Sequence, residues 1–166
     1  MGIFSRARDI LQANVSDLLD KAEDPAKTIR LVIMEMEETL VEVRASAART
    51  IADQKETRRT IMKLDAAQAN WAEKAELALS KSREDLATAA LVEKQKVGAM
   101  VEQMRGDVGA LEDDLRAHED DISKLEAKLR EARTRQNALL SRLESAQSRA
   151  RVRIMRSEER RVGKEC

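Results

Sequence analysis

One apolar stripe, repeated every seven residues, limits how this chain can fold more than any other feature of its sequence. Steps of alternately four and three residues from Val97 to Ala150 land almost entirely on apolar side chains. So long and narrow a stripe must be buried along another helix, which is typical of a coiled coil. We call this stripe the second seam, and its members are Val97, Val101, Met104, Val108, Leu111, Leu115, His118, Ile122, Leu125, Leu129, Ala132, Gln136, Leu139, Leu143, Ala146 and Ala150.

The composition favours thin helical contacts over a bulky core. Of the 166 residues, 1% are aromatic and 37% are charged, as in an extended helical protein. The 31 basic and 31 acidic side chains balance and are interspersed, which disfavours direct nucleic-acid binding. No apolar run reaches the length of a membrane-spanning helix. Arg6, Arg8 and Asp9 interrupt what would be the apolar part of a signal peptide, so we expect a cytoplasmic protein.

A second long helix is predicted to begin at Asp24-Pro25. Asp is a preferred N-cap, and Pro is harmless at the first helical position, where its missing N–H would have no partner. We therefore expect a hinge over residues 21–24 and at Asp24 and Pro25. The first seam follows, fades over the polar residues 53–59 and then resumes; its members are Ile29, Ile33, Met36, Leu40, Val43, Ala47, Ile51, Ile61, Leu64, Gln68, Trp71, Ala75 and Ala78.

The two seams are out of phase, and the slip falls at residues 80–85. Ser82 followed by Asp85 is an acceptable capping box, so a new helix can start there. No Gly or Pro enforces a turn, however, and a coiled-coil stutter gives the same slip without reversing the chain. The residues alone slightly favour a hairpin, in which the second seam meets the first seam in an antiparallel pair.

The first nineteen residues form an amphipathic segment. Its apolar residues fall within about half of a helical wheel, with Arg6 and Arg8 on the two flanks of that face. Such a helix can lie in the plane of a membrane, with arginine stems along the lipid. It can equally dock on the protein's own coiled coil, and the wheel does not choose between the two. The apolar residues are Ile3, Phe4, Ala7, Ile10, Leu11, Val15, Leu18 and Leu19.

No group of residues in the sequence predicts a catalytic or metal-binding site. His118 is the only histidine and lies in the second seam, where a polar residue setting the register is far commoner than a metal ligand. Adjacent carboxylates such as Asp113 and Asp114 point in different directions on a helix and cannot act together as acid and base. Trp71 either packs against the facing helix or forms a hot spot for a protein partner. We expect no enzyme, and no catalytic, metal or cofactor site.

The last eleven residues resemble a cloning artefact. The string R-S-E-E-R-R-V-G-K-E-C over Arg156–Cys166 looks like the translation of a sequencing-adapter oligonucleotide. We exclude it from reasoning about fold and function. We therefore expect three native regions, which are a helix over 1–20, the hinge and a hairpin over 25–155, and we expect the native sequence to continue beyond about residue 155.

Several strings, in order, carry a family resemblance. They are M-G-I-F-S-R, K-A-E-D-P, E-M-E-E-T-L-V-E-V-R, W-A-E-K-A-E-L-A-L and R-E-D-L-A-T-A-A-L-V-E-K-Q-K. Over about residues 1–148 the chain resembles the phage shock protein A family, a bacterial branch of the ESCRT-III superfamily related to the thylakoid vesicle-inducing protein. Family members continue with further helices that help subunits polymerise, and this chain departs from them at the adapter-like tail.

The resemblance implies an all-α fold in which a short N-terminal amphipathic helix precedes a long antiparallel two-helix coiled-coil hairpin. It implies a stress protein on the cytoplasmic face of the inner membrane that binds anionic or packing-defective lipid and inhibits an AAA+ enhancer-binding transcription activator through the hairpin. The alternative is a membrane-remodelling polymer, and the full-length form is expected to be a homo-oligomer. The implied membrane-binding residues are Ile3, Phe4, Arg6, Ala7, Arg8, Ile10, Leu11, Val15 and Leu18, and the hairpin seam residues are Ile29, Ile33, Met36, Leu40, Val43, Trp71, Val97, Met104, Leu111, Leu115, Ile122, Leu125 and Leu129.

Overall fold

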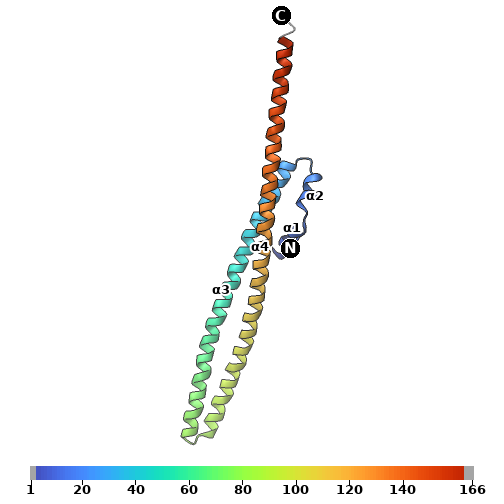
Figure 1. The fold of residues 1–166 in the computed structure, drawn as a ribbon. Helices are drawn as coiled ribbons and strands as arrows, with labels where there is room; N and C mark the ends of the chain where they lie inside the picture. The colour runs from blue at the N-terminus through green and yellow to red at the C-terminus, as the bar shows by residue number, and fades with distance from the viewer. Residues whose placement is uncertain (1–2, 163–166) are drawn as a thin grey trace. The chain divides into compact units, whose positions relative to one another are not determined.

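The structure, a computed structural model, describes the backbone of residues 3–162 and the side chains of residues 6–161. Four helices make up the described chain, namely α1 (Ile3–Gln12), α2 (Val15–Asp20), α3 (Pro25–Ser80) and α4 (Glu84–Val162), and no strand occurs within it. The predicted all-α fold with a long antiparallel helix pair is confirmed (Figure 1). None of these helices has an apolar stretch long enough to cross a bilayer.

Helix α3 begins where its capping residues predict. Pro25 is its first residue, and the Asp24 carboxylate accepts the backbone N–H of Lys27 at 3.1 Å. The Thr28 N–H donates to the Asp24 carbonyl at 3.0 Å. The Asp24 side chain therefore satisfies one of the N–H groups that a helix start leaves without an intrahelical partner, and its carbonyl accepts the first intrahelical bond.

The chain reverses at residues 81–83, which rules out the stutter. Ser82 has a left-handed backbone with φ of 55°. Its N–H donates to the Leu79 carbonyl at 3.0 Å, and the Arg83 N–H donates to the Ala78 carbonyl at 2.9 Å. This pair of bonds is a Schellman motif, which ends α3. Ser82 thus terminates α3 instead of joining Asp85 in the predicted capping box, and the Asp85 carboxylate accepts from the Arg83 guanidinium instead.

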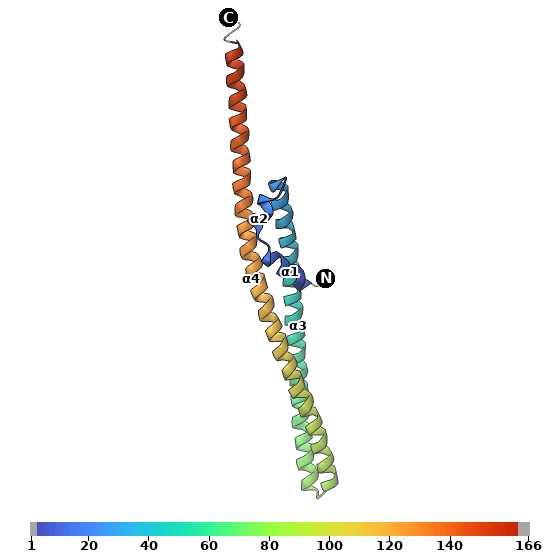
Figure 2. The same ribbon diagram turned by 90° about the vertical axis from the view of Figure 1, so that its right-hand side faces the viewer.

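The chain divides into two compact units, and each contains part of α3 and part of α4. Unit 1 comprises Met1–Val43 and Asp121–Cys166. In it α1 and α2 lie beside α3 and α4 (Figure 2). Its core is one cluster to which all four helices contribute. The buried members of the cluster are Ala7, Val15, Ile29, Ile33, Met36, Leu40, Val43, Leu125, Leu129 and Ala132.

Unit 2, Arg44–Asp120, is a two-helix contact with a thinner core. Its buried apolar residues are mostly alanines, namely Ala47, Ala75, Ala87 and Ala90, together with Val101. His118 is 3% exposed, and its Nε2 lies 3.4 Å from the Ser46 hydroxyl of the facing helix. Over the polar stretch where the first seam fades, the Glu112 carboxylate accepts from Arg58 at 2.6 Å and from Gln54 at 3.4 Å. Polar pairs therefore replace apolar packing there.

Within unit 1, α4 continues beyond the part that α3 covers. From Leu140 to Arg161 every described side chain is exposed, including Leu140 at 44% and Leu143 at 47%. In both views the red end of α4 runs past the start of α3 (Figures 1 and 2). The second seam therefore loses its partner after Leu139, because α3 starts only at Pro25.

Candidate functional site

The apolar face of the N-terminal segment is packed against the rest of unit 1. Ala7 is 1% exposed and Val15 is 5% exposed, and both belong to the core cluster. Ile10, Leu11 and Leu19 are partly buried against the same cluster. Of the two partners that the helical wheel allowed, the structure places the protein's own long helices against this face.

The segment is two helices instead of the single helix predicted. Helix α1 ends at Gln12, and Asn14 is extended, with φ of −88° and ψ of 106°. The Asn14 side-chain oxygen accepts the Ser16 N–H at 3.1 Å, so Asn14 is the N-cap of α2. Asp17 in the first turn of α2 adds a favourable charge at that helix end. The sequence therefore contains a start signal inside the apparent helix.

Lys128 of α4 joins the two short helices. Its ammonium group donates to the Ile10 carbonyl at 3.1 Å and to the Ala13 carbonyl at 2.8 Å. Helix α1 has no basic residue in its own last turn. A cation is favourable at a helix C-terminus, because the last carbonyls lack intrahelical partners and carry partial negative charge. Lys128 supplies from another helix the charge that α1 lacks.

Two arginines also contact the segment. The Arg135 guanidinium donates to the Ser16 hydroxyl, and it donates to Glu131 of its own helix at 2.6 Å. Arg6 lies 3.9 Å from Glu42, with side chains 59% and 41% exposed, a pair that water screens strongly. Charged contacts thus fasten the segment at its start, middle and end.

The residues predicted to contact lipid differ in how deeply they are buried in this arrangement. Ala7 and Val15 are buried, Ile10 and Leu11 are partly buried, and Leu18 is 45% exposed. Arg6 and Arg8 are exposed on the flanks. The side chains of Ile3 and Phe4 lie outside the described residues, although both positions belong to α1.

Most residues of the two seams lie at the contacts between long helices; Ile51 and the second seam beyond Leu139 are exposed. In unit 1, Ile29, Ile33, Met36, Leu40, Val43, Leu125 and Leu129 are buried, and Ile122 is half-buried. In unit 2, Trp71, Val97, Met104, Leu111 and Leu115 are half-buried. Of the two residues predicted to form a hinge, Pro25 is half-buried and Asp24 is exposed.

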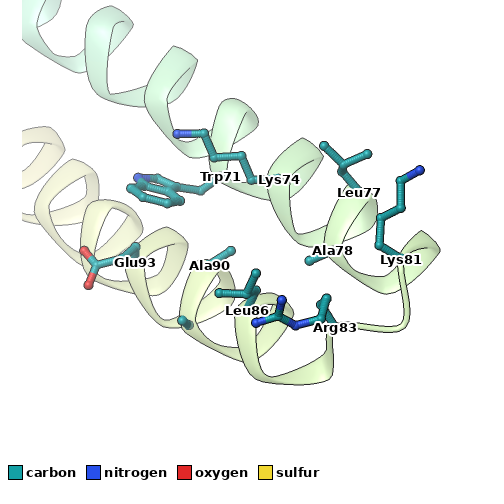
Figure 3. Close-up of a pocket in the computed structure, with 10 residues that line it drawn as sticks. Trp71, Lys74, Leu77, Ala78, Lys81, Arg83, Leu86, Ala90 and Glu93 are labelled. Atoms are coloured by element: carbon teal, nitrogen blue, oxygen red, sulfur yellow. The ribbon is translucent and has the colours of Figure 1, made fainter.

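A second feature, in unit 2, is an open apolar groove of about 590 Å³ beside the turn. Figure 3 shows Trp71 and Ala78 of α3 facing Leu86 and Ala90 of α4 across it. The Lys74 ammonium lies 4.3 Å from the centre of the Trp71 ring, a cation–π contact. The groove therefore offers an aromatic surface with a positive charge above it.

Arg83 and Asp85 form an ion pair at the turn between α3 and α4. The Arg83 guanidinium donates to both carboxylate oxygens of Asp85, at 3.1 and 2.9 Å. These bonds favour the ionised carboxyl, so they lower the pKa of Asp85 and raise the pKa of Arg83. The Arg83 side chain thus pairs with Asp85. Lys74 and Lys81 are the other cations that line the groove.

The described side chains include no candidate metal site. Among residues 6–161, no three His, Cys, Asp or Glu side chains lie close enough to hold an ion. Sequence reasoning missed Lys128 and Arg135, because an exposed-looking lysine or arginine on a long helix carries no local sign of a distant partner. Asn14 did carry a sign, since Asn with Asp three residues later is a helix start.

Comparison with known proteins gives consistent matches along the chain. The sequence matches the PspA/IM30 family over residues 2–158. It is 34% identical to the membrane-associated protein Vipp1 of Synechocystis sp., over 92% of this chain and 57% of that protein. It is 31% identical to the phage shock protein A homolog of Deinococcus radiodurans, over 89% of this chain and 66% of that protein. The membrane-associated protein VIPP1, chloroplastic, of Arabidopsis thaliana is 27% identical over 93% of this chain and 47% of its own length. The chain thus spans less than two thirds of the length of these relatives.

Proposed function

This chain belongs to the PspA/IM30 family, as its motifs predicted, and on that premise we propose that it is a non-catalytic, peripheral membrane-stress protein. Its α1–α2 segment leaves the long helices and binds the cytoplasmic face of the inner membrane. The lipid that it binds is anionic or has packing defects. Relatives named as membrane-associated proteins support this role.

The observation that carries the proposal is that one apolar face has two possible partners. The face that includes Ala7 and Val15 is buried on the core cluster, and Arg6 and Arg8 flank it. An in-plane membrane helix needs the same features, which are an apolar side and flanking cations that reach phosphates. Docking on protein and binding to lipid therefore exclude each other.

Because the segment cannot be docked on protein and bound to lipid at the same time, its position responds to the state of the membrane. Lipid binding shifts the population from the docked to the released state only by its differential affinity for the two states. Asp9 and Asp17 offset the two arginines, so attraction to a flat anionic surface is weak. Packing defects add apolar contact, and the segment then prefers the membrane. The residues proposed for the lipid face are those of the sequence prediction, with Asp24 and Pro25 as the hinge.

We also propose that the protein regulates transcription. In resting cells the long helices hold an AAA+ enhancer-binding activator inactive, and membrane damage draws the protein away from it. The groove beside the turn is the surface we assign to this partner, because Trp71 is the residue type most enriched in binding hot spots. Inhibition of the activator's ATP hydrolysis is the readout for this role.

A second candidate function is a membrane-remodelling polymer that maintains membrane integrity. The observation that favours it is the bare end of the second seam on α4, which includes Leu143, Ala146 and Ala150. An apolar heptad stripe without a partner is suited to a second copy of the chain. In this function regulation of transcription is incidental.

The substitution Phe4→Glu tests the membrane proposal. A carboxylate in the middle of the apolar face opposes insertion, so the variant should no longer sediment with vesicles of phosphatidylethanolamine and phosphatidylglycerol, while its circular dichroism stays helical. Met62→Glu is the matched control, because Met62 is 71% exposed on α3 and lies outside the segment. Sedimentation of Phe4→Glu at the wild-type level would refute lipid binding by this face.

A further inference from the structure

We propose that Lys128 is the residue that holds the α1–α2 segment in its docked, membrane-inactive form. The inference rests on the proposed function and adds its regulation. The Lys128 ammonium selects the broken form of the segment, because it binds carbonyl groups that a continuous helix would use for its own hydrogen bonds.

The contact is specific to the break between α1 and α2. Lys128 binds the carbonyl of Ile10, in the last turn of α1, and the carbonyl of Ala13, in the linker. Both bonds are charge-assisted and have good lengths, and such bonds are roughly twice as strong as neutral ones. The lysine is itself half-buried, so its ammonium is partly shielded from water.

A continuous helix would require the same two acceptors. In an α-helix each carbonyl accepts the N–H four residues later, so Ile10 would pair with Asn14 and Ala13 with Asp17. In the structure both carbonyls accept from Lys128 instead. A carbonyl oxygen can accept two hydrogen bonds, so Lys128 does not block the helical bonds outright, but it stabilises the form in which its ammonium replaces them.

The apolar face distinguishes the two states. On a continuous wheel Leu18 shares the face of Val15 and Ile10. In the docked form Val15 is 5% exposed, but Leu18 is 45% exposed. A membrane plane favours the continuous helix, because only that form brings all these side chains to one surface. Releasing the two carbonyls from Lys128 is thus part of forming the lipid-bound helix.

The other fastenings are less suited to this task. Arg135 divides its guanidinium between Ser16 and Glu131, and it reaches a side-chain hydroxyl that either form of the segment can present. Arg6 and Glu42 are 3.9 Å apart and largely exposed. Lys128 is the contact that senses whether the backbone at residues 10–13 is broken.

The test is Lys128→Met in the full 166-residue chain. Methionine keeps the length and apolar stem of the side chain and removes only the ammonium. We expect faster amide hydrogen exchange over residues 3–20 without lipid. We also expect half-maximal sedimentation with phosphatidylglycerol-containing vesicles at about tenfold less lipid, since apparent affinity rises with the released fraction.

Arg133→Met is the matched control. Arg133 lies on the same helix in the same unit, and it binds Glu37 of α3 at 2.6 Å. Its loss removes a cation and loosens the α3–α4 contact without touching the carbonyls of the segment. Equal effects of the two substitutions on exchange and on lipid requirement would mean general loosening, and would overturn the proposal.

The remaining outcomes separate the two proposals. Unchanged exchange over residues 3–20 in Lys128→Met overturns the assigned role of Lys128, whatever the vesicles show. Faster exchange with an unchanged lipid requirement also overturns it, because docking would not limit membrane binding. Faster exchange in Lys128→Met, when neither the wild type nor the variant sediments with vesicles, supports Lys128 as the docking contact and refutes the proposed function.

Discussion

A single side chain, Asn14, decides where the N-terminal segment stops being one helix. Its oxygen accepts the Ser16 N–H, and its extended backbone leaves the Ala13 carbonyl open to Lys128. Replacing an asparagine N-cap with alanine costs about 1 kcal/mol of helix stability. In a continuous helix the same position is interior, and alanine there has the best helix propensity. Asn14 therefore favours one state of the segment and disfavours the other.

Asn14→Ala should shift the segment toward the continuous, released helix. We expect about fivefold or more reduction in the lipid needed for half-maximal vesicle binding, from the lost cap and the gained propensity together. Vesicle sedimentation at fixed protein concentration measures it. Asn14→Ser keeps a neutral acceptor oxygen at the N-cap and should behave as the wild type. A lipid requirement in Asn14→Ala equal to that of the wild type would argue that the break does not control binding.

At the scale of elements, the turn between α3 and α4 is closed by a residue poorly suited to its backbone. Ser82 has φ of 55°, in the left-handed region that glycine occupies without steric cost. A residue with a Cβ pays roughly 1–2 kcal/mol there. The Schellman bonds to Leu79 and Ala78 offset this cost, and so does the packing of the two long helices.

Ser82→Gly should therefore stabilise the pair of long helices. We expect the free energy of unfolding in urea to rise by about 1 kcal/mol, as the left-handed strain is removed. Ser80→Gly is the matched control, since Ser80 is the last residue of α3, and we expect it to lower stability by up to about 1 kcal/mol. A decrease in stability for Ser82→Gly would mean that the serine side chain contributes more than its strain costs.

The elements that sequence reasoning could predict are those with local or periodic signals. Asp24 and Pro25 mark the start of α3 by capping and a fixed φ, and the slip between seams located the turn. The left-handed residue was not predictable, because serine does not signal that backbone. The contact of Lys128 with Ile10 was not predictable either, since the partners are 118 residues apart and neither residue type requires the other.

At the scale of the whole molecule, burial stops abruptly along α4. The second seam is covered up to Leu139, and beyond it Leu143, Ala146 and Ala150 are exposed, Leu143 at 47%. Helices without tertiary contacts are marginal in water, so a bare stripe of this length gains stability from a partner. A second copy offers the same stripe, which supports the proposed homo-oligomer.

Leu143→Glu should weaken that association. A charge in the stripe must be desolvated at any helix–helix contact, so we expect a lower weight-average mass at equal concentration in multi-angle light scattering. Ser141→Glu places the same charge on a neighbouring exposed position outside the stripe, and its mass should match the wild type. Masses that fall equally in both variants, or in neither, would count against association through this stripe.

The groove beside the turn holds the only tryptophan of the chain. Trp71 therefore gives the protein a single intrinsic fluorophore, and the residues around it come from α3 and α4 of unit 2 alone. Release of the segment that Lys128 holds, an event within unit 1, should leave the emission maximum where it is. A blue shift on adding a partner or vesicles would instead report that the groove itself has been filled.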